Sequence, residues 1–390
     1  MRSANAVDHA AVVRFVDETL ALAVRERASD IHFEPFEHEF RVRFRVDGAL
    51  RETATPSLAL ALPVISRLKV LANVNLAERR VPQDGRIRML LDGQAADFRL
   101  STLPTQFGES VVLRVLDQSA GRLELAEIGL PPAIHDGIAA ALERPHGIVI
   151  VTGPTGSGKT TTLYSCLKRL NTPAAKLLTI EDPVEYELEG IMQVAVNPAA
   201  DLTFARALRT FLRQDPDVVM VGEIRDPETA RIGIQAALTG HLVLTTLHTN
   251  DAPSAVTRLA DMGIEPFLLA STIEAVLAQR LLRRVCPDCR TVCELPTELC
   301  GHLGTKAAFA GPFYRGQGCA KCAQSGYRGR LGIFEFLRVT DRLRELVADS
   351  ASLMELRQCA AAEGGGSLRD AGLAAALAGE TTLEEVLKYT

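Results

Sequence analysis

Residues 147–164 read GIVIVTGPTGSGKTTTLY, an apolar run followed by a glycine-rich loop and a segment compatible with a helix. Gly153, Gly158, Lys159 and Thr160 satisfy the G-x-x-x-x-G-K-[ST] pattern in the strand–loop–helix context that this pattern requires. Glycines let the backbone wrap phosphates, and successive N–H groups at a helix N-terminus supply positive potential. The stretch therefore predicts a nucleoside triphosphate site in an α/β fold.

The residues of this loop have distinct expected roles. We expect Lys159 to neutralise the β/γ oxygens and the Thr160 hydroxyl to ligate Mg²⁺. ATP is the favoured nucleotide, although the loop itself does not exclude GTP. The predicted nucleotide-binding residues of the loop are Gly153, Pro154, Thr155, Gly156, Ser157, Gly158, Lys159, Thr160 and Thr161.

Acidic and histidine residues flank three further apolar runs, in LLTIEDPVEY, DVVMVGEIRD and HLVLTTLHTND. Glu181 and Asp182 end the first run, Glu223 follows the second, and His248 ends the third, which His241 precedes. Parallel-sheet folds gather their chemistry at the carboxyl edge, so we expect the acidic groups to converge there. Glu223 could hold a Mg²⁺-bound water or orient the attacking one. Singly, such residues are more often structural, but beside the phosphate loop they predict ATP hydrolysis.

The N-terminal part of the chain has a different pattern. Apolar positions at helical spacing over residues 7–28 predict an amphipathic helix. FRVRFRVDGALR and GRIRMLLDGQAADFRLS then alternate apolar and polar residues around Asp-Gly turn signals. These patterns predict an α+β domain of antiparallel hairpins. One strand face would carry Arg41, Arg43 and Arg45, either as a solvated face or as a charged surface between subunits.

The alternation stops before Pro131-Pro132, which predicts a linker. From residue 147 onward, short apolar runs separated by helical or loop segments indicate a mostly parallel sheet covered by helices. The expected divisions are an N-terminal domain over 1–115, a linker over 116–132, an ATPase core over 133–282, a cysteine module over 283–330 and a helical region over 331–390.

Two C-x-x-C pairs, separated by residues 290–318, lie in the cysteine module. Two thiolate pairs at such spacing suit a tetrahedral, structural Zn²⁺ site, and a longer spacer adds little closure cost. A redox role is disfavoured because no thioredoxin-like βαβ pattern surrounds either pair. Cys293 and Cys300 could compete as ligands, whereas Cys166 and Cys359 are expected to be core thiols. The predicted ligands are Cys286, Cys289, Cys319 and Cys322.

Composition bounds the remaining possibilities. The chain has 390 residues, and its 43 Lys plus Arg against 48 Asp plus Glu give a net charge of −5, which disfavours a general nucleic-acid binder. The start, MRSANAVDHAAVVRF, lacks the apolar core of a signal peptide, and no apolar run approaches the ~20 residues of a membrane span. We therefore expect a cytoplasmic protein whose eight cysteines serve metal binding or packing.

Taken together, these segments resemble the secretion ATPase superfamily, in particular its type II secretion E protein and type IV pilus assembly ATPase branch. The matching segments are ASDIHFEPF, FRVRFRVDG, VPQDGRIR, GPTGSGKTTTLY, TIEDPVEY, LRQDPDVVMVGEIRD, TGHLVLTTLHTNDA and GYRGRLGIFE. The resemblance makes GPTGSGKTTTLY the Walker A segment and VGEIRD the Walker B segment, with Glu223 as its acid. It also implies an Asp box with Glu181 and Asp182, and a His box with His241 and His248, in which Glu181 and His248 act in catalysis and Asp182 and His241 bind the nucleotide.

The resemblance further implies a RecA-like P-loop NTPase domain, an N-terminal PAS-like α+β domain, and a C-terminal helical region carrying the tetracysteine zinc module. ATP would bind between the two domains of each subunit in a hexameric ring. In such rings, arginines of the N-terminal domain reach the phosphates, and Arg99 in DFRLST and Arg114 in VVLRVL occupy the matching positions. Without the resemblance, each would be an exposed strand arginine.

The implied function is a cytoplasmic ATPase that powers pseudopilus or pilus assembly, peripherally associated with the bacterial inner membrane through platform and docking proteins. A pilus-retraction motor is one alternative, disfavoured because retraction ATPases typically lack the tetracysteine insert. A nucleic-acid translocase is another, disfavoured by the acidic net charge and the absence of an aromatic–basic stripe. Full-length members usually carry a further N-terminal docking domain, so we expect either a truncated chain or a short natural form.

Overall fold

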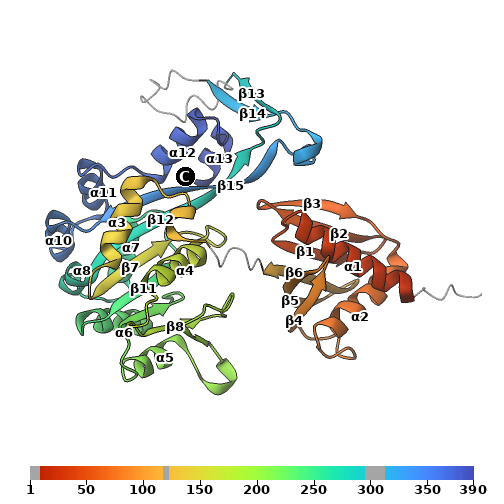
Figure 1. The fold of residues 1–390 in the computed structure, drawn as a ribbon, viewed down its shortest axis with the longest axis horizontal. Coiled ribbons are helices and arrows are strands. Elements are labelled where there is room, and N and C mark those ends of the chain that lie inside the picture. The colour runs from red at the N-terminus through yellow and green to blue at the C-terminus, as the bar shows by residue number, and fades with distance from the viewer. Residues whose placement is uncertain (1–8, 117–122, 295–311) are drawn as a thin grey trace, which may run out of the picture. The chain divides into compact units, whose positions relative to one another are not determined.

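The computed structural model describes residues 9–116, 123–294 and 312–390. The chain divides into two compact units, residues 1–118 and residues 119–390 (Figure 1). The expected linker lies partly outside the described residues. None of the helices in the described ranges combines the length and the apolarity that a bilayer crossing requires.

The first unit contains one antiparallel six-stranded sheet with the strand order β3-β2-β1-β6-β5-β4. Both expected hairpins are present, and their Asp-Gly turns have positive φ at both residues, as the two-residue turn requires. The elements are α1 (His9–Arg25), β1 (Asp30–Pro35), β2 (Phe40–Val46), β3 (Ala49–Ala54), η1 (Leu58–Leu60), α2 (Ala61–Leu71), β4 (Gln83–Leu91), β5 (Gln94–Thr105) and β6 (Gly108–Leu116).

The two faces of this sheet differ as the alternation predicts. Phe40, Val42 and Phe44 of β2 are fully buried, in a cluster with residues of α1 and α2, which lie along one face (Figure 1). The arginines between them lie on the opposite face. There, Arg99 of β5 lies directly opposite Arg114 of β6. The two arginines predicted to reach a nucleotide are therefore cross-strand neighbours.

The second unit contains a seven-stranded sheet with the order β15-β12-β7-β11-β10-β8-β9, in which only the β12–β15 pair is antiparallel. The mostly parallel sheet is thus as predicted. Its strands are β7 (Gly147–Thr152), β8 (Leu177–Glu181), β9 (Met192–Ala195), β10 (Val218–Val221), β11 (Leu242–Leu247), β12 (Ile273–Val285) and β15 (Tyr327–Arg338), and β13 (Arg290–Cys293) pairs separately with β14 (Phe313–Gly316).

Helices cover both faces of this sheet. Every residue of β7 is buried, because Val149 and Val151 pack toward one face and Ile148 and Ile150 toward the other. The first face is covered by α3 (Pro132–Leu142) and α4 (Lys159–Leu170), which follows the phosphate loop. The other face is covered by α5 (Phe204–Phe211), α6 (Pro227–Leu238), α7 (Pro253–Asp261), α8 (Pro266–Thr272), α10 (Asp341–Ala348), α11 (Leu353–Ala362), α12 (Leu368–Leu377) and α13 (Leu383–Tyr389).

The C-terminal part of the chain contributes to this sheet as well as to its helical cover. β15 crosses the boundary expected at residue 330, so residues 331–338 form strand and not helix. β12 needs this partner because it continues for 13 residues, and its free edge would otherwise leave backbone groups unpaired. Ile333, Phe334 and Leu337 of β15 are buried and complete the core at this edge.

Candidate functional site

The phosphate loop, residues 153–158, joins the end of β7 to the start of α4. Gly153, Gly156 and Gly158 have φ values of 150°, 79° and 89°, a region that side-chain-bearing residues rarely adopt. A Cβ added at Gly153 would also lie 2.6 Å from the Gln279 carbonyl oxygen and 2.7 Å from Ser157 Oγ. The loop therefore requires glycine for both conformation and space, and it presents the N-terminus of α4 as an anion-binding site.

Lys159 is held over this loop. Its Nζ donates to the carbonyls of Gly153 at 2.9 Å and Pro154 at 3.1 Å, acceptors that phosphate oxygens could replace. Burial lowers the pKa of Lys159 to about 8; the charge of Glu223 opposes this shift, while that of Arg280 adds to it. The loop, one acid and a second cation thus share one electrostatic environment.

Glu223 lies just beyond the end of β10. The Thr246 hydroxyl of β11 donates to the carbonyl of Gly222 at 2.6 Å, which fixes the backbone beside Glu223. One carboxylate oxygen of Glu223 accepts from Arg225 at 2.5 Å, and the other lies 3.5 Å from His248 Nε2. The structure therefore brings Glu223 and His248 together at the carboxyl edge that also carries the phosphate loop.

His248 lies near both the negative charge of Glu223 and the positive charges of Lys159 and Arg225. Burial is the main cause that lowers its pKa, and Lys159 lowers it further, although Glu223 raises it. The imidazole is therefore neutral near pH 7. Arg225 remains charged, because its hydrogen bond to Glu223 raises its pKa.

Glu181 ends β8 but turns into the core, where it is 3% exposed. One of its oxygens accepts from the Thr179 hydroxyl at 2.7 Å and from Gln193 Nε2 at 3.1 Å, and the other accepts from the Tyr164 hydroxyl of α4. Burial raises the pKa of Glu181. Its neighbour Asp182 is exposed. The side chain of Glu181 thus ties α4 to the sheet, and its catalytic role stays a prediction.

His241 lies at the other end of β11 from His248. Its Nδ1 is 2.9 Å from the Ala236 carbonyl, and its own carbonyl accepts from Gly147 N, where β7 begins. The phosphate loop starts where β7 ends. Since β11 has six residues, about 20 Å of strand separates the two edges. Within one chain, therefore, the structure does not bring His241 to the phosphate loop, and its nucleotide-binding role stays a prediction.

Gln279 of β12 is a site residue that the sequence reasoning missed. Its side chain is buried, donates to the Ser157 carbonyl at 2.6 Å and accepts from the Thr162 hydroxyl at 2.8 Å. It therefore braces both the phosphate loop and the first turn of α4. The available signal was the polar pair Gln279-Arg280 inside the otherwise apolar run IEAVLAQRLL, because buried polar groups in such runs need specific partners.

Arg99 and Arg114 both belong to the first unit. Arg114 Nε lies 3.2 Å from an oxygen of Asp30 in the neighbouring strand β1. The phosphate loop belongs to the second unit, so the expected reach of these arginines to a nucleotide stays a prediction.

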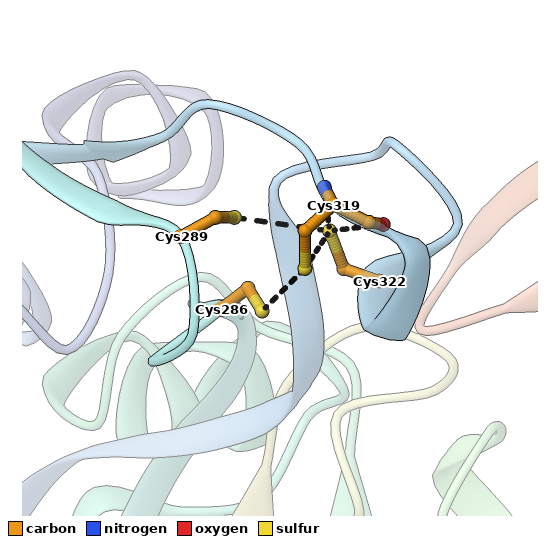
Figure 2. Close-up of side chains that lie close together, drawn as sticks. All are labelled: Cys286, Cys289, Cys319 and Cys322. Carbon is orange, nitrogen blue, oxygen red and sulfur yellow. Dashed lines mark hydrogen bonds between the residues drawn. The ribbon is translucent and has the colours of Figure 1, made fainter.

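The four predicted zinc ligands converge on one point (Figure 2). Sγ–Sγ distances are 3.9 Å for Cys286–Cys319, 3.9 Å for Cys289–Cys322 and 3.6 Å for Cys319–Cys322, and all four sulfurs lie within 4.8 Å of one another. Tetrahedral Zn–S bonds of about 2.3 Å require sulfurs about 3.8 Å apart. The donor set and its spacing therefore fit a structural zinc ion. Of the two competing cysteines, Cys293 lies in β13 outside this cluster, and Cys300 falls outside the described residues.

Comparison with known proteins shows the family to which the chain belongs. The family described as "Type II/IV secretion system protein" matches residues 5–388. The chain is 52% identical over 383 residues to type II secretion system protein E of Pseudomonas aeruginosa, covering 98% of this chain and 76% of that protein. It is 50% identical over 391 residues to the type IV pilus assembly ATPase PilB of Myxococcus xanthus, covering 99% and 69%. The fold matches that of the Legionella pneumophila ATPase DotB with a TM-score of 0.71 and 22% identity, over 96% of this chain and 95% of that one.

Proposed function

Because the chain belongs to the type II/IV secretion system protein family, we propose that it hydrolyses ATP to power the assembly of a pseudopilus or pilus fibre, in type II secretion or type IV pilus extension. The observation that carries the proposal is that Glu223 and His248 lie together at the sheet edge that carries the phosphate loop and Lys159. The second unit would be a RecA-like P-loop ATPase domain and the first a PAS-like domain.

Nucleotide binding follows from the loop. Backbone N–H groups at the start of α4 and the ammonium group of Lys159 would hold the phosphates of ATP. Thr160, exposed in the first turn of α4, would ligate Mg²⁺. Mg²⁺, when bound, would neutralise charge on the β and γ oxygens.

Glu223 is the group placed to act on the attacking water. Its carboxylate would orient that water and take its proton, while the hydrogen bond from Arg225 holds one oxygen in place. Neutral His248, 3.5 Å from the other oxygen, would orient the carboxylate without neutralising its negative charge, which the carboxylate needs to accept a proton. Asp182 would act indirectly, through its charge on Arg225.

The lowered pKa of Lys159 predicts a pH dependence of ATP affinity. In the nucleotide-free protein Lys159 loses its proton as the pH rises through about 8. Bound phosphates favour the charged amine and raise its pKa, so binding above pH 8 requires proton uptake. We therefore expect the Kd for ATP to rise up to about tenfold per pH unit above pH 8.

Titration calorimetry between pH 7 and 9.5 measures this dependence, and buffers of different ionisation enthalpy report the proton uptake. Lys159→Arg is the matched control, because its guanidinium stays charged throughout the range. A Kd for the wild-type chain that stays constant from pH 7 to 9.5 would contradict the prediction.

The proposed assembly is a hexameric ring. Arg99 and Arg114, paired across β5 and β6, would supply positive charge to phosphates bound by the second unit, so that domain closure follows the nucleotide state. Inner-membrane platform and docking proteins would recruit the ring to the cytoplasmic face of the membrane. The tetracysteine cluster would hold Zn²⁺ as a closed, structural site.

The proposal predicts ATPase activity that depends on assembly. We expect the rate per subunit to rise with protein concentration, because each site needs residues that the ring positions. Phosphate release is measured across a concentration series, with mass photometry on the same samples. A rate per subunit that stays constant while the oligomer forms would refute a role for the ring in catalysis.

Single-stranded DNA separates the two main classes of motor. An export motor should hydrolyse ATP at the same rate with and without DNA, given the acidic net charge of −5. Stimulation of tenfold or more by DNA would instead support a nucleic-acid translocase.

A further inference from the structure

Arg280 of β12 is a buried cation with an unusual set of partners. The residue is 5% exposed, and its side chain donates only to backbone carbonyls: Gln279 at 3.1 Å, Asn250 at 2.7 Å and Tyr389 at 3.3 Å. Among the described residues no carboxylate lies within ion-pair distance of it. A buried charge without a direct counter-ion is costly, so a specific role for this guanidinium is expected.

Two of these carbonyls belong to other segments of the second unit, whereas the Gln279 carbonyl belongs to the residue before Arg280 on β12. Gln279 braces the phosphate loop, and a Cβ at Gly153 would lie 3.1 Å from Arg280 Nη1. Asn250 lies two residues after His248, and Tyr389 ends α13. One side chain therefore joins the segment that carries His248 to the last helix, and its Nη1 lies beside Gly153 of the phosphate loop.

The segment 248–252, termed the His248 loop, is also held by hydrogen bonds at Thr249 and Ala252. The Thr249 hydroxyl lies 2.7 Å from that of Thr152, at the end of β7. Ala252 N donates to Glu335 of β15 at 3.0 Å, and the other oxygen of Glu335 accepts from Leu368 N of α12 at 3.1 Å. The position of His248 thus depends on contacts with β12, β15 and the C-terminal helices.

We propose that Arg280 is a positioning residue of the nucleotide site, which fixes the His248 loop and the phosphate loop relative to each other and to the end of α13. The inference rests on the proposed ATP hydrolysis. Its planar guanidinium can reach three divergent carbonyls at once, whereas a lysine ammonium cannot. Glu335 and Asp251 offset its charge only from beyond ion-pair distance, so this charge also adds to the positive potential near the phosphate loop, where it lowers the pKa of Lys159 as a smaller cause after burial.

Two substitutions separate positioning from charge. Arg280→Lys keeps the charge and loses the bridge, so we expect kcat to fall about tenfold or more while the Kd for ATP changes less than about threefold. Arg280→Met loses both, so the Kd for ATP should also rise about tenfold. Steady-state kinetics at matched protein concentration, ATP-binding titrations and thermal melts are measured for each full-length variant.

Arg283→Lys is the matched control. Arg283 lies on the same strand and also holds α13, through Glu385 at 2.5 Å, but within the described part of the chain no contact links it to the phosphate loop or the His248 loop. We expect its kcat to stay within about twofold of wild type. An equal loss of kcat in both lysine variants would overturn the proposal, because general loosening of α13 would then be sufficient to explain the loss. A kcat of Arg280→Lys within twofold of wild type would overturn it as well.

The proposal can be tested even if Arg280→Lys does not fold or the wild-type chain does not hydrolyse ATP. If Arg280→Lys does not fold, a chain lacking Tyr389 and Thr390 removes one acceptor instead, and an unchanged kcat in that chain overturns the assignment. If the wild-type chain binds ATP without hydrolysing it, the proposed function fails separately. The Arg280 assignment then stands or falls on whether Arg280→Met, but not Arg283→Lys, weakens ATP binding.

Discussion

Glu223→Gln is expected to lower kcat for ATP hydrolysis by about 100-fold or more while the Kd for ATP changes less than about threefold. The amide keeps the size of the side chain and can still bond to Arg225, but it cannot accept a proton from water. Lys159 and the loop backbone, which hold the phosphates, are unchanged. Single-turnover hydrolysis and ATP-binding titrations give the two quantities.

Glu189→Gln is the control for the same chemical change. Glu189 is exposed, and its backbone carbonyl accepts a hydrogen bond from Asn171, so the substitution leaves that contact in place. Its kcat should equal that of wild type. A Glu223→Gln chain that hydrolyses ATP at the wild-type rate would remove Glu223 from its role and leave Glu181 and Asp182 as the strand-end carboxylates to test.

The sheet and the loop could be predicted from sequence because short-range rules govern them. The run GIVIV, the glycines of the loop and the Asp-Gly hairpins each express a local requirement of burial or of positive φ. Strand ends are likewise local, so Glu223 and His248 were placed at the correct edge. The register of β11 then sets His241 at the opposite edge, which follows from its position before the strand.

Other features depend on contacts that spacing does not encode. Glu181 turns inward because Tyr164, Thr179 and Gln193 offer it hydrogen bonds, and these residues come from three different elements. Gln279 reaches the phosphate loop only because β12 pairs beside β7. Side-chain direction and non-neighbouring strand order are tertiary properties, so neither was accessible from a single sequence.

The cysteine cluster lies beside the connection between α12 and α13, and α13 also contacts Arg280. β12 leads directly into the first cysteine pair, and Val285 N donates to the Glu380 carbonyl between α12 and α13 at 2.9 Å. On the other side of the cluster, the Tyr327 hydroxyl lies 3.0 Å from that of Thr382. If the cluster holds a metal, its loss would loosen one end of β12 and the α12–α13 connection, while Gln279, which contacts the phosphate loop, lies farther along the strand.

Cys289→Ser is expected to remove stoichiometric zinc and to lower the Tm by roughly 5–10 °C, because a three-cysteine remnant loses most of the coordination energy that holds the two cysteine pairs together. Zinc content is measured by elemental mass spectrometry, and opening of the cluster by limited proteolysis. ATP should still bind with an affinity within about threefold of wild type, since none of the four described cysteines of the cluster contacts the phosphate loop.

Cys359→Ser is the control. Cys359 is a half-buried thiol of α11 outside the cluster, so this variant should keep both the zinc content and the Tm of wild type. One zinc per chain and an unchanged Tm in Cys289→Ser would show that the four sulfurs, although correctly spaced, do not hold the metal.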